Sequence, residues 1–171
     1  MTATTMTQTY EARSRAAGEI VREAGRVALA AFRDRGSLSV QTKGRQDWVT
    51  NVDLEVEALI RDRLGRLFPG DAIVGEETAH DPASGNTAWV IDPIDGTTCF
   101  MLGVPQWCVV LTYTIDARPV VSAIYAPVTD ELFHATAGGG AFLNGAPIRV
   151  ADAKGIGAGL IAVCDSMRGG L

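Results

Sequence analysis

Residues 89–98 read Trp89-Val90-Ile91-Asp92-Pro93-Ile94-Asp95-Gly96-Thr97-Thr98 and carry the most informative pattern in the chain. An apolar, β-branched run typical of a buried strand stops there on two carboxylates. Because proline cannot donate a hydrogen bond to a ladder, the strand is predicted to end at Asp92 and to be followed by a rigid turn. We therefore expect Asp92 and Asp95 to face one point at the carboxyl end of a strand.

Two carboxylates held together repel each other unless a cation or a proton neutralises them, so this pair indicates a divalent cation site. The N–H groups of Gly96, Thr97 and Thr98 follow directly and offer an anion site at what could be the start of a helix. A metal site beside an anion site points to phosphate chemistry. A plain turn is the alternative, because Asp, Pro and Gly are also common turn residues.

Length and composition predict one globular domain over residues 1–171, since 47% of the residues are hydrophobic. The net charge of -5 argues against nucleic acid as a partner. No apolar run approaches the roughly 18 residues that span a bilayer, and the polar N-terminus has no apolar leader, so we expect no membrane partner and a cytoplasmic location. The odd number of cysteines, without a CxxC pair, favours buried thiols over disulfides or zinc ligands at Cys99, Cys108 and Cys164.

Apolar periodicity predicts two helices followed by a series of strands. The first helix covers residues 8–34, and the second runs from a cap formed by Thr50 and Asp53 to a stop at residues 69–70. This order indicates an α+β fold with the helices packed on one face of a mainly antiparallel sheet. Strands are predicted at residues 37–42, 72–74, 88–92, 107–114, 119–126, 131–136, 141–150 (with a tight turn at Asn144-Gly145) and 160–163.

Further acids stand at the ends of predicted elements. Glu76 follows the strand at residues 72–74 as Asp92 follows its own strand, and Asp53 opens the second helix. If these elements are neighbours, four or five carboxylates share a cleft. Each also has a plain alternative, with Asp53 as part of a helix cap, Glu76 and Glu77 as a solvated turn, and Asp47 as loop surface. Spacing alone leaves both interpretations open.

Three blocks of the sequence resemble the inositol monophosphatase family of Mg²⁺-dependent, lithium-sensitive phosphatases. They are Lys43 with residues 47–53, the triplet Gly75-Glu76-Glu77, and residues 89–98; the run at residues 138–145 is also similar to a family turn. The resemblance extends from Lys43 to about residue 150. It implies the N-terminal half of a layered αβαβα fold, without the family's C-terminal α/β half.

The resemblance also implies a ligand set for Mg²⁺. Glu76, Asp92 and the backbone carbonyl of Ile94 hold one ion, and Asp92 bridges to a second ion that Asp95 also holds. Glu77 supports this set or adds a further contact. The chemistry implied is hydrolysis assisted by two metal ions.

Roles toward the substrate follow from the same resemblance. Thr97 and Asp53 form a hydrogen-bonded pair that orients and deprotonates the attacking water, beside Glu76 with its metal. The N–H groups of Gly96 and Thr97 bind the phosphate, and Lys43 lies on a mobile loop near the site.

The implied function is Mg²⁺-dependent hydrolysis of a small phosphate monoester, with inositol monophosphate favoured. Histidinol phosphate, sugar phosphates and 3′-phosphonucleotides are substrates of relatives, and an inactive metal-binding or assembly module is the rival interpretation. The chain departs from the family at Cys99, where Asn is usual, and lacks the C-terminal Asp that ligates the second metal. We expect a homo-oligomer, such as a dimer, because a sheet without its second layer exposes an apolar face.

Overall fold

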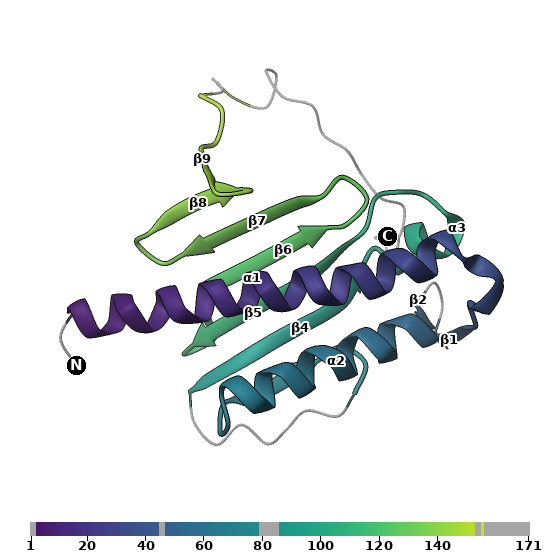
Figure 1. The fold of residues 1–171 in the computed structure, drawn as a ribbon, viewed down its shortest axis with the longest axis horizontal. Helices are drawn as coiled ribbons and strands as arrows, with labels where there is room; N and C mark the ends of the chain where they lie inside the picture. The colour runs from purple at the N-terminus through teal and green to yellow at the C-terminus, as the bar shows by residue number, and fades with distance from the viewer. Residues whose placement is uncertain (1–2, 45–46, 79–85, 153–154, 156–171) are drawn as a thin grey trace.

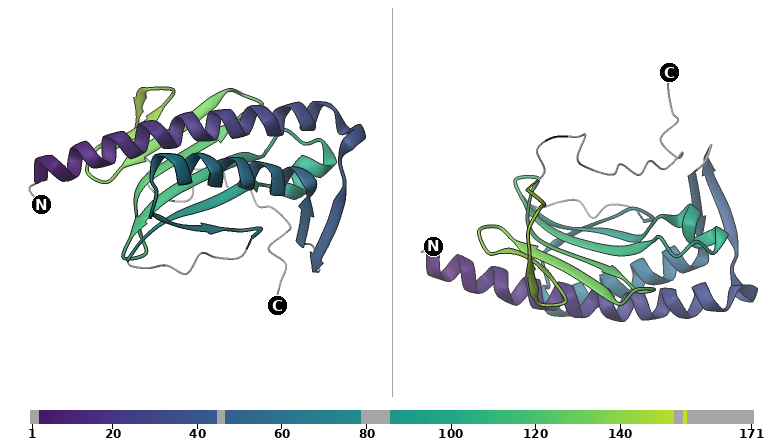
Figure 2. Two further views of the ribbon diagram at one scale, coloured as in Figure 1. Left: turned by 60° about the horizontal axis from the view of Figure 1, so that its bottom comes forward. Right: turned by 90° about the horizontal axis from the view of Figure 1, so that it is seen from above.

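Two helices lie side by side across one face of a twisted sheet in the computed structural model, which describes residues 3–44, 47–78, 86–152 and 155 (Figure 1). The views in Figure 2 show both helices on the same side of the sheet. The described elements are α1 (Ala3–Arg33), the 3₁₀ turn η1 (Arg35–Ser37), β1 (Val40–Gly44), β2 (Asp47–Thr50), α2 (Asn51–Leu67), β3 (Ala72–Gly75), β4 (Thr87–Asp95), α3 (Thr97–Leu102), β5 (Cys108–Ile115), β6 (Arg118–Ala126), β7 (Glu131–Thr136), β8 (Gly140–Leu143) and β9 (Ala146–Ile148).

The main sheet has seven strands in the order β3-β4-β5-β6-β7-β8-β9. Only β3 and β4 pair in parallel, and every later pair is antiparallel. Short connections explain this, because antiparallel neighbours can be joined by tight turns. The predicted α+β fold with a mainly antiparallel sheet is therefore confirmed.

The core fills the space between the helices and the sheet. Small residues on α1, among them Ala24 and Ala28, are fully buried and let the helix approach the strands closely. At Gly25 the approach is tightest, since a Cβ there would lie 2.5 Å from the ring of Tyr125. Trp89 on β4 and Leu111 on β5 are fully buried. This packing holds α2 beside β4.

The start of the chain differs from the sequence prediction in two places. Helix α1 begins at Ala3 rather than at residue 8, and the strand predicted at residues 37–42 is replaced by η1 followed by β1. The loop predicted after residue 42 is also wrong at its ends, because β1 and β2 pair antiparallel in a separate two-stranded sheet. Backbone pairing between Ser39 and Asn51 at 3.1 Å closes this sheet onto the start of α2.

Strand β4 continues to Asp95, so the prediction that it ends at Asp92 is wrong. The physical reason lies in its neighbours. Pairing with β3 stops at Ile91, and the register with β5 is irregular between Asp92 and Asp95. Pro93 is therefore never required to donate a ladder hydrogen bond, and it lies buried in the extended segment.

The strand predicted at residues 141–150 is divided in two. Asn144 (φ 48°) and Gly145 (φ 82°) turn the chain between β8 and β9, which confirms the tight turn predicted there. The strand predicted at residues 160–163 lies outside the described residues. Within the described ranges, none of the helices has the length and apolar character needed to cross a bilayer.

Candidate active site

The parallel pairing of β3 and β4 brings two predicted site acids to one edge of the sheet. Gly75 pairs with Ile91 at the end of the ladder, and the next residue on each strand is an acid, Glu76 and Asp92. The carboxyl ends of parallel strands lie at the same edge of a sheet. The structure therefore makes neighbours of two residues that are separated by 15 others in the sequence.

Asp92 lies at the centre of a cluster of carboxylates. Burial and the negative charges of Glu76, Asp95 and Asp53, together with a hydrogen bond between Asp92 and Glu76, raise the pKa of Asp92 to about 8. The Oδ1 atom of Asp92 is buried and has no hydrogen-bond partner among the described residues. A buried, unpartnered carboxylate oxygen among three other acids is an unfavourable arrangement unless a cation or a proton joins it.

Asp53 contacts two threonines at once, Thr50 in the helix cap and Thr97 at the start of α3. Its Oδ2 atom accepts hydrogen bonds from the backbone N–H of Thr50 at 2.9 Å and from the Thr50 hydroxyl, which completes the capping box of α2. Its Oδ1 atom faces the hydroxyl of Thr97 at 3.3 Å. Asp53 is only 1% exposed, so this second oxygen is held toward Thr97 and away from bulk water.

The hydroxyl of Thr97 has one proton and two acceptors within reach. It lies 3.0 Å from the backbone carbonyl oxygen of Ile94 and 3.3 Å from Asp53. The Ile94 carbonyl is the closer of the two, and it is also the carbonyl predicted to bind metal. The proton of Thr97 can therefore point to the predicted metal ligand or to the predicted proton acceptor.

Gly96 connects β4 to α3. It adopts φ 96°, and a Cβ there would lie 2.8 Å from the carbonyl oxygen of Gln106, so both conformation and space require glycine. Helix α3 begins at Thr97, which confirms that a helix starts directly after the acids. The first N–H groups of a helix have no partner within it, so those near Gly96 and Thr97 are available in principle to an anion. Their binding of phosphate stays a prediction.

Glu57 is a functional candidate that the sequence analysis missed. It lies on α2, its side chain is fully buried, and its Oε2 atom accepts the backbone N–H of Glu77 at 2.8 Å. Burial alone would raise the pKa of Glu57, but hydrogen bonds from Thr78, Arg61 and the Glu77 amide lower it overall. The signal in the sequence was an acid four residues after Asp53, among apolar positions of one helix face.

Cys108 is a second neighbour of the site that sequence reasoning did not assign to it. It pairs with Asp95 across β4 and β5, and its thiol donates to Asp95 Oδ2 at 3.6 Å. Burial, followed by the charge of Asp95, raises the pKa of Cys108 to about 12, so the thiol is protonated at neutral pH. Cys99 and Cys108 are free but only partly buried, so the expectation of buried thiols is wrong for both; Cys164 lies outside the described residues. Cys108 thus contacts one of the site acids, Asp95.

Lys43 lies in β1 rather than in a loop, and its predicted proximity to the site stays a prediction. Glu77 is partly buried beside Glu57. The described residues do not form a group of three or more His, Cys, Asp or Glu side chains that could hold a metal as they stand. Uncompensated carboxylates repel one another, and the oxygen of Asp92 that has no partner is acted on by three further acids. These features fit a divalent cation.

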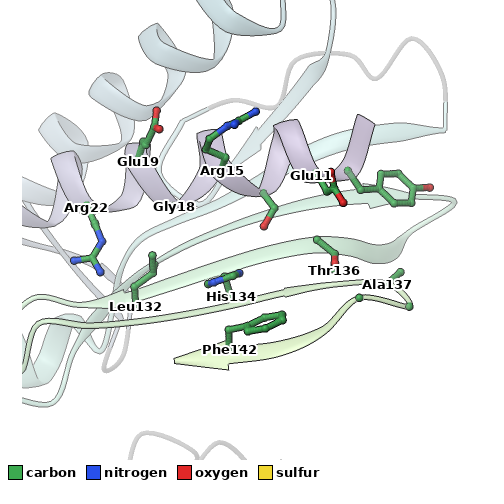
Figure 3. Close-up of a pocket in the computed structure, with 14 residues that line it drawn as sticks. Glu11, Arg15, Gly18, Glu19, Arg22, Leu132, His134, Thr136, Ala137 and Phe142 are labelled. Carbon is green, nitrogen blue, oxygen red and sulfur yellow. The ribbon is translucent and has the colours of Figure 1, made fainter. Parts of the chain in front are cut away.

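A pocket lies elsewhere, between residues 10–22 of α1 and strands β7 and β8 (Figure 3). It encloses about 670 Å³, and His134 stacks on Phe142 on its sheet side with ring centroids 5.1 Å apart. None of the predicted site residues lines it. The acidic site therefore lies at an edge of the sheet, outside this pocket.

These features place the chain among α+β proteins that gather carboxylates at the ends of neighbouring strands. The chain belongs to the inositol monophosphatase family, whose model matches residues 5–168. It is 41% identical over 147 residues to an inositol monophosphatase of Dictyostelium discoideum, covering 84% of this chain and 54% of that protein. It is 38% identical to a histidinol-phosphatase of Chlorobaculum parvum, covering 77% of this chain and 51% of that protein.

Solved structures show the same relationship. The extragenic suppressor protein suhB of Bartonella henselae aligns with a TM-score of 0.80 and 30% identity, covering 83% of this chain and 55% of that one. An IMPase/NADP phosphatase complexed with Mg²⁺ and phosphate aligns with a TM-score of 0.63 and 28% identity, covering 71% of this chain and 48% of that one. The chain spans about half the length of the relatives it matches.

Proposed function

We propose that this chain carries the metal-binding half of a Mg²⁺-dependent phosphatase acting on small phosphate monoesters. The observation that supports this most directly is Asp92, whose buried Oδ1 atom lacks a partner while Glu76, Asp95 and Asp53 act on it. Oxygen ligands of this kind suit Mg²⁺. A related structure that contains Mg²⁺ and phosphate supports the choice of metal and of substrate chemistry.

In this proposal Mg²⁺ is held by Glu76, Asp92, Asp95 and the carbonyl of Ile94. A metal bound there supplies charge neutralisation and a more acidic water. The family match over residues 5–168 supports phosphatase chemistry, and the ligand set itself is our proposal. Glu77 borders it, and its backbone N–H is already held by Glu57.

The remaining roles belong to residues around the turn at Gly96. Thr97 accepts a proton from the attacking water as its own proton moves toward Asp53, and the 3.3 Å separation of their oxygens supports this pairing. The backbone N–H groups of Gly96 and Thr97 bind the phosphate oxygens. Lys43 adds a positive charge nearby.

Inositol monophosphate is the substrate we favour, because two relatives named inositol monophosphatase are 41% identical to this chain, against 38% for the relative named histidinol-phosphatase. A histidinol-phosphate phosphatase is the second candidate, supported by the relative of that name. A metal-binding module without activity is the rival, because the chain spans about half of its relatives' length.

The test is phosphate release from a panel of monoesters that includes inositol 1-phosphate, histidinol phosphate, a sugar phosphate and a 3′-phosphonucleotide. We expect release that requires Mg²⁺ and is abolished by chelation. The 171-residue chain and any longer version of it are assayed side by side. Mg²⁺ binding without release in every version would favour the inactive module.

We also propose that the chain forms a homo-oligomer, such as a dimer, in a cytoplasmic setting that suits its free cysteines. The sheet supports the first point. Within the described ranges no helix covers the face opposite α1 and α2 (Figure 2). Val90 and Ile124 point to that face and are 39% and 36% exposed.

Sedimentation velocity should therefore show a species larger than a monomer at tens of micromolar. Replacing Val90 and Ile124 by Thr, which keeps the β-branched shape, should shift the distribution toward monomer. Val128→Thr is the control, because Val128 is 37% exposed but lies in the turn after β6 and not on a strand of the sheet. A well-behaved wild-type monomer would rule out the oligomer.

A further inference from the structure

The carboxylate of Glu57 joins helix α2 to the turn that carries Glu76. Its Oε2 atom accepts the backbone N–H of Glu77 at 2.8 Å, and its Oε1 atom accepts the hydroxyl of Thr78. Arg61, one turn further along α2, donates its Nε–H to Oε1 at 2.9 Å. The side chain of Glu57 is fully buried, so these donors replace water around it.

The position of Gly75 shows how closely this carboxylate is fitted to the turn. A Cβ at Gly75 would lie 2.0 Å from Oε1 and 2.6 Å from Oε2 of Glu57. A Cβ atom does not lie this close to an oxygen atom in real structures. The carboxylate of Glu57 therefore occupies the space that a side chain at position 75 would need. Gly75 is also the last residue of β3 paired with β4. Glu57 therefore contacts the backbone where the chain leaves the sheet and turns into Glu76.

The contacts of Glu57 lie on both sides of Glu76 along the chain. The side chain of Glu57 reaches the residue before Glu76 and the two residues after it, while Glu76 itself is exposed. Glu76 acts on Asp92 through both charge and a hydrogen bond. A backbone fixed on both sides of Glu76 limits the directions in which its side chain can point.

We propose that Glu57 is a positioning residue, which fixes residues 75–78 and so directs Glu76 toward Asp92. Its role in metal binding rests on the proposed function; its role in fixing the turn does not. Glu57→Gln keeps the size of the side chain but replaces an acceptor oxygen by an NH₂ group. Because Glu57 accepts from donors on both oxygens, at least one of these donors then loses its partner.

Two measurements on the 171-residue chain test the proposal. Amide hydrogen exchange at Glu77 should accelerate by about tenfold or more in Glu57→Gln, because the turn loses at least one of the buried hydrogen bonds that hold it in place. Calorimetric titration with MgCl₂ alone should show affinity about tenfold weaker, the usual scale for residues that orient metal ligands. The matched control is Asp62→Asn, because Asp62 also lies on α2 and pairs with an arginine four residues on, Arg66, but is exposed.

Each outcome decides the proposal. Exchange at Glu77 as slow in Glu57→Gln as in Asp62→Asn would overturn it, and so would faster exchange with unchanged Mg²⁺ affinity. If the wild-type chain binds no Mg²⁺, the proposed function fails, while the exchange rates still decide whether Glu57 fixes the turn. Should Glu57→Gln not fold, Thr78→Ala removes one donor from the exposed end of the turn, and the same two measurements apply to it.

Discussion

Thr97→Ala and Asp53→Asn should each lower the turnover number by about 10²- to 10⁴-fold in whatever version of the protein is active. The hydroxyl of Thr97 lies 3.3 Å from Asp53 Oδ1, and Asp53 is held in place by the cap of α2. Removing either group leaves the attacking water without a route for its proton. Mg²⁺ affinity should be largely kept, because neither side chain belongs to the proposed ligand set. Steady-state phosphate release at saturating Mg²⁺ measures the effect.

The double variant shows whether the two residues act as one unit. Turnover of Thr97→Ala/Asp53→Asn should be little lower than that of either single variant, because groups that act together are non-additive. Thr98→Ala is the control for a lost hydroxyl at the start of α3. Melting temperatures of the Asp53→Asn proteins separate the loss of the cap, worth about 1 kcal/mol, from the loss of catalysis. Losses that multiply in the double variant would exclude a relay from Thr97 to Asp53.

Asp92→Asn should weaken Mg²⁺ binding by at least about 100-fold, because it removes the charge at the centre of the proposed ligand set. Calorimetric titration of the intact chain with MgCl₂ is the direct measurement. Asp62→Asn is again the control, since Asp62 forms an exposed pair with Arg66 on α2. Equal Mg²⁺ affinity of Asp92→Asn and wild type would show that Asp92 is not a ligand.

In the metal-free protein, Asp92→Asn should raise the free energy of unfolding at alkaline pH. The pKa of Asp92 is raised to about 8 in the folded chain by burial and by neighbouring acids, against about 4 when unfolded. Between these values the folded state binds more protons than the unfolded state, so the free energy of unfolding falls as pH rises from about 4 to about 8. Asn does not titrate and avoids this loss.

Urea unfolding in EDTA at pH 5 and at pH 8.5 measures the effect. Wild type should lose more stability between the two pH values than Asp92→Asn does. Mg²⁺ in excess over EDTA should restore the stability of wild type at pH 8.5 but not that of Asp92→Asn. Parallel pH dependences of the two proteins would mean that Asp92 is not the buried, repelled carboxylate that the structure indicates.

Local features of this protein could be predicted from the sequence because they depend on residues close together in the chain. The capping box joins Thr50 and Asp53 across three positions, and the turn at Asn144 and Gly145 depends on their tolerance of positive φ. The helix at Thr97 begins where Gly96 allows the chain to leave the strand. Periodicity of apolar residues likewise predicted both long helices and the antiparallel strands.

The meeting of the acids was decided by tertiary structure. The hydroxyl of Thr97 reaches Asp53 across 44 positions of sequence, and Glu76 reaches Asp92 only because β3 and β4 pair in parallel. Strand β4 continues through Pro93 because the neighbouring strands do not need a hydrogen bond from a backbone N–H at that position. Glu57 shows the limit most clearly. Its sequence context is an acid on a helix, and only its packing against Gly75 shows that it holds the turn of Glu76, because a contact between distant segments exists only once both are packed.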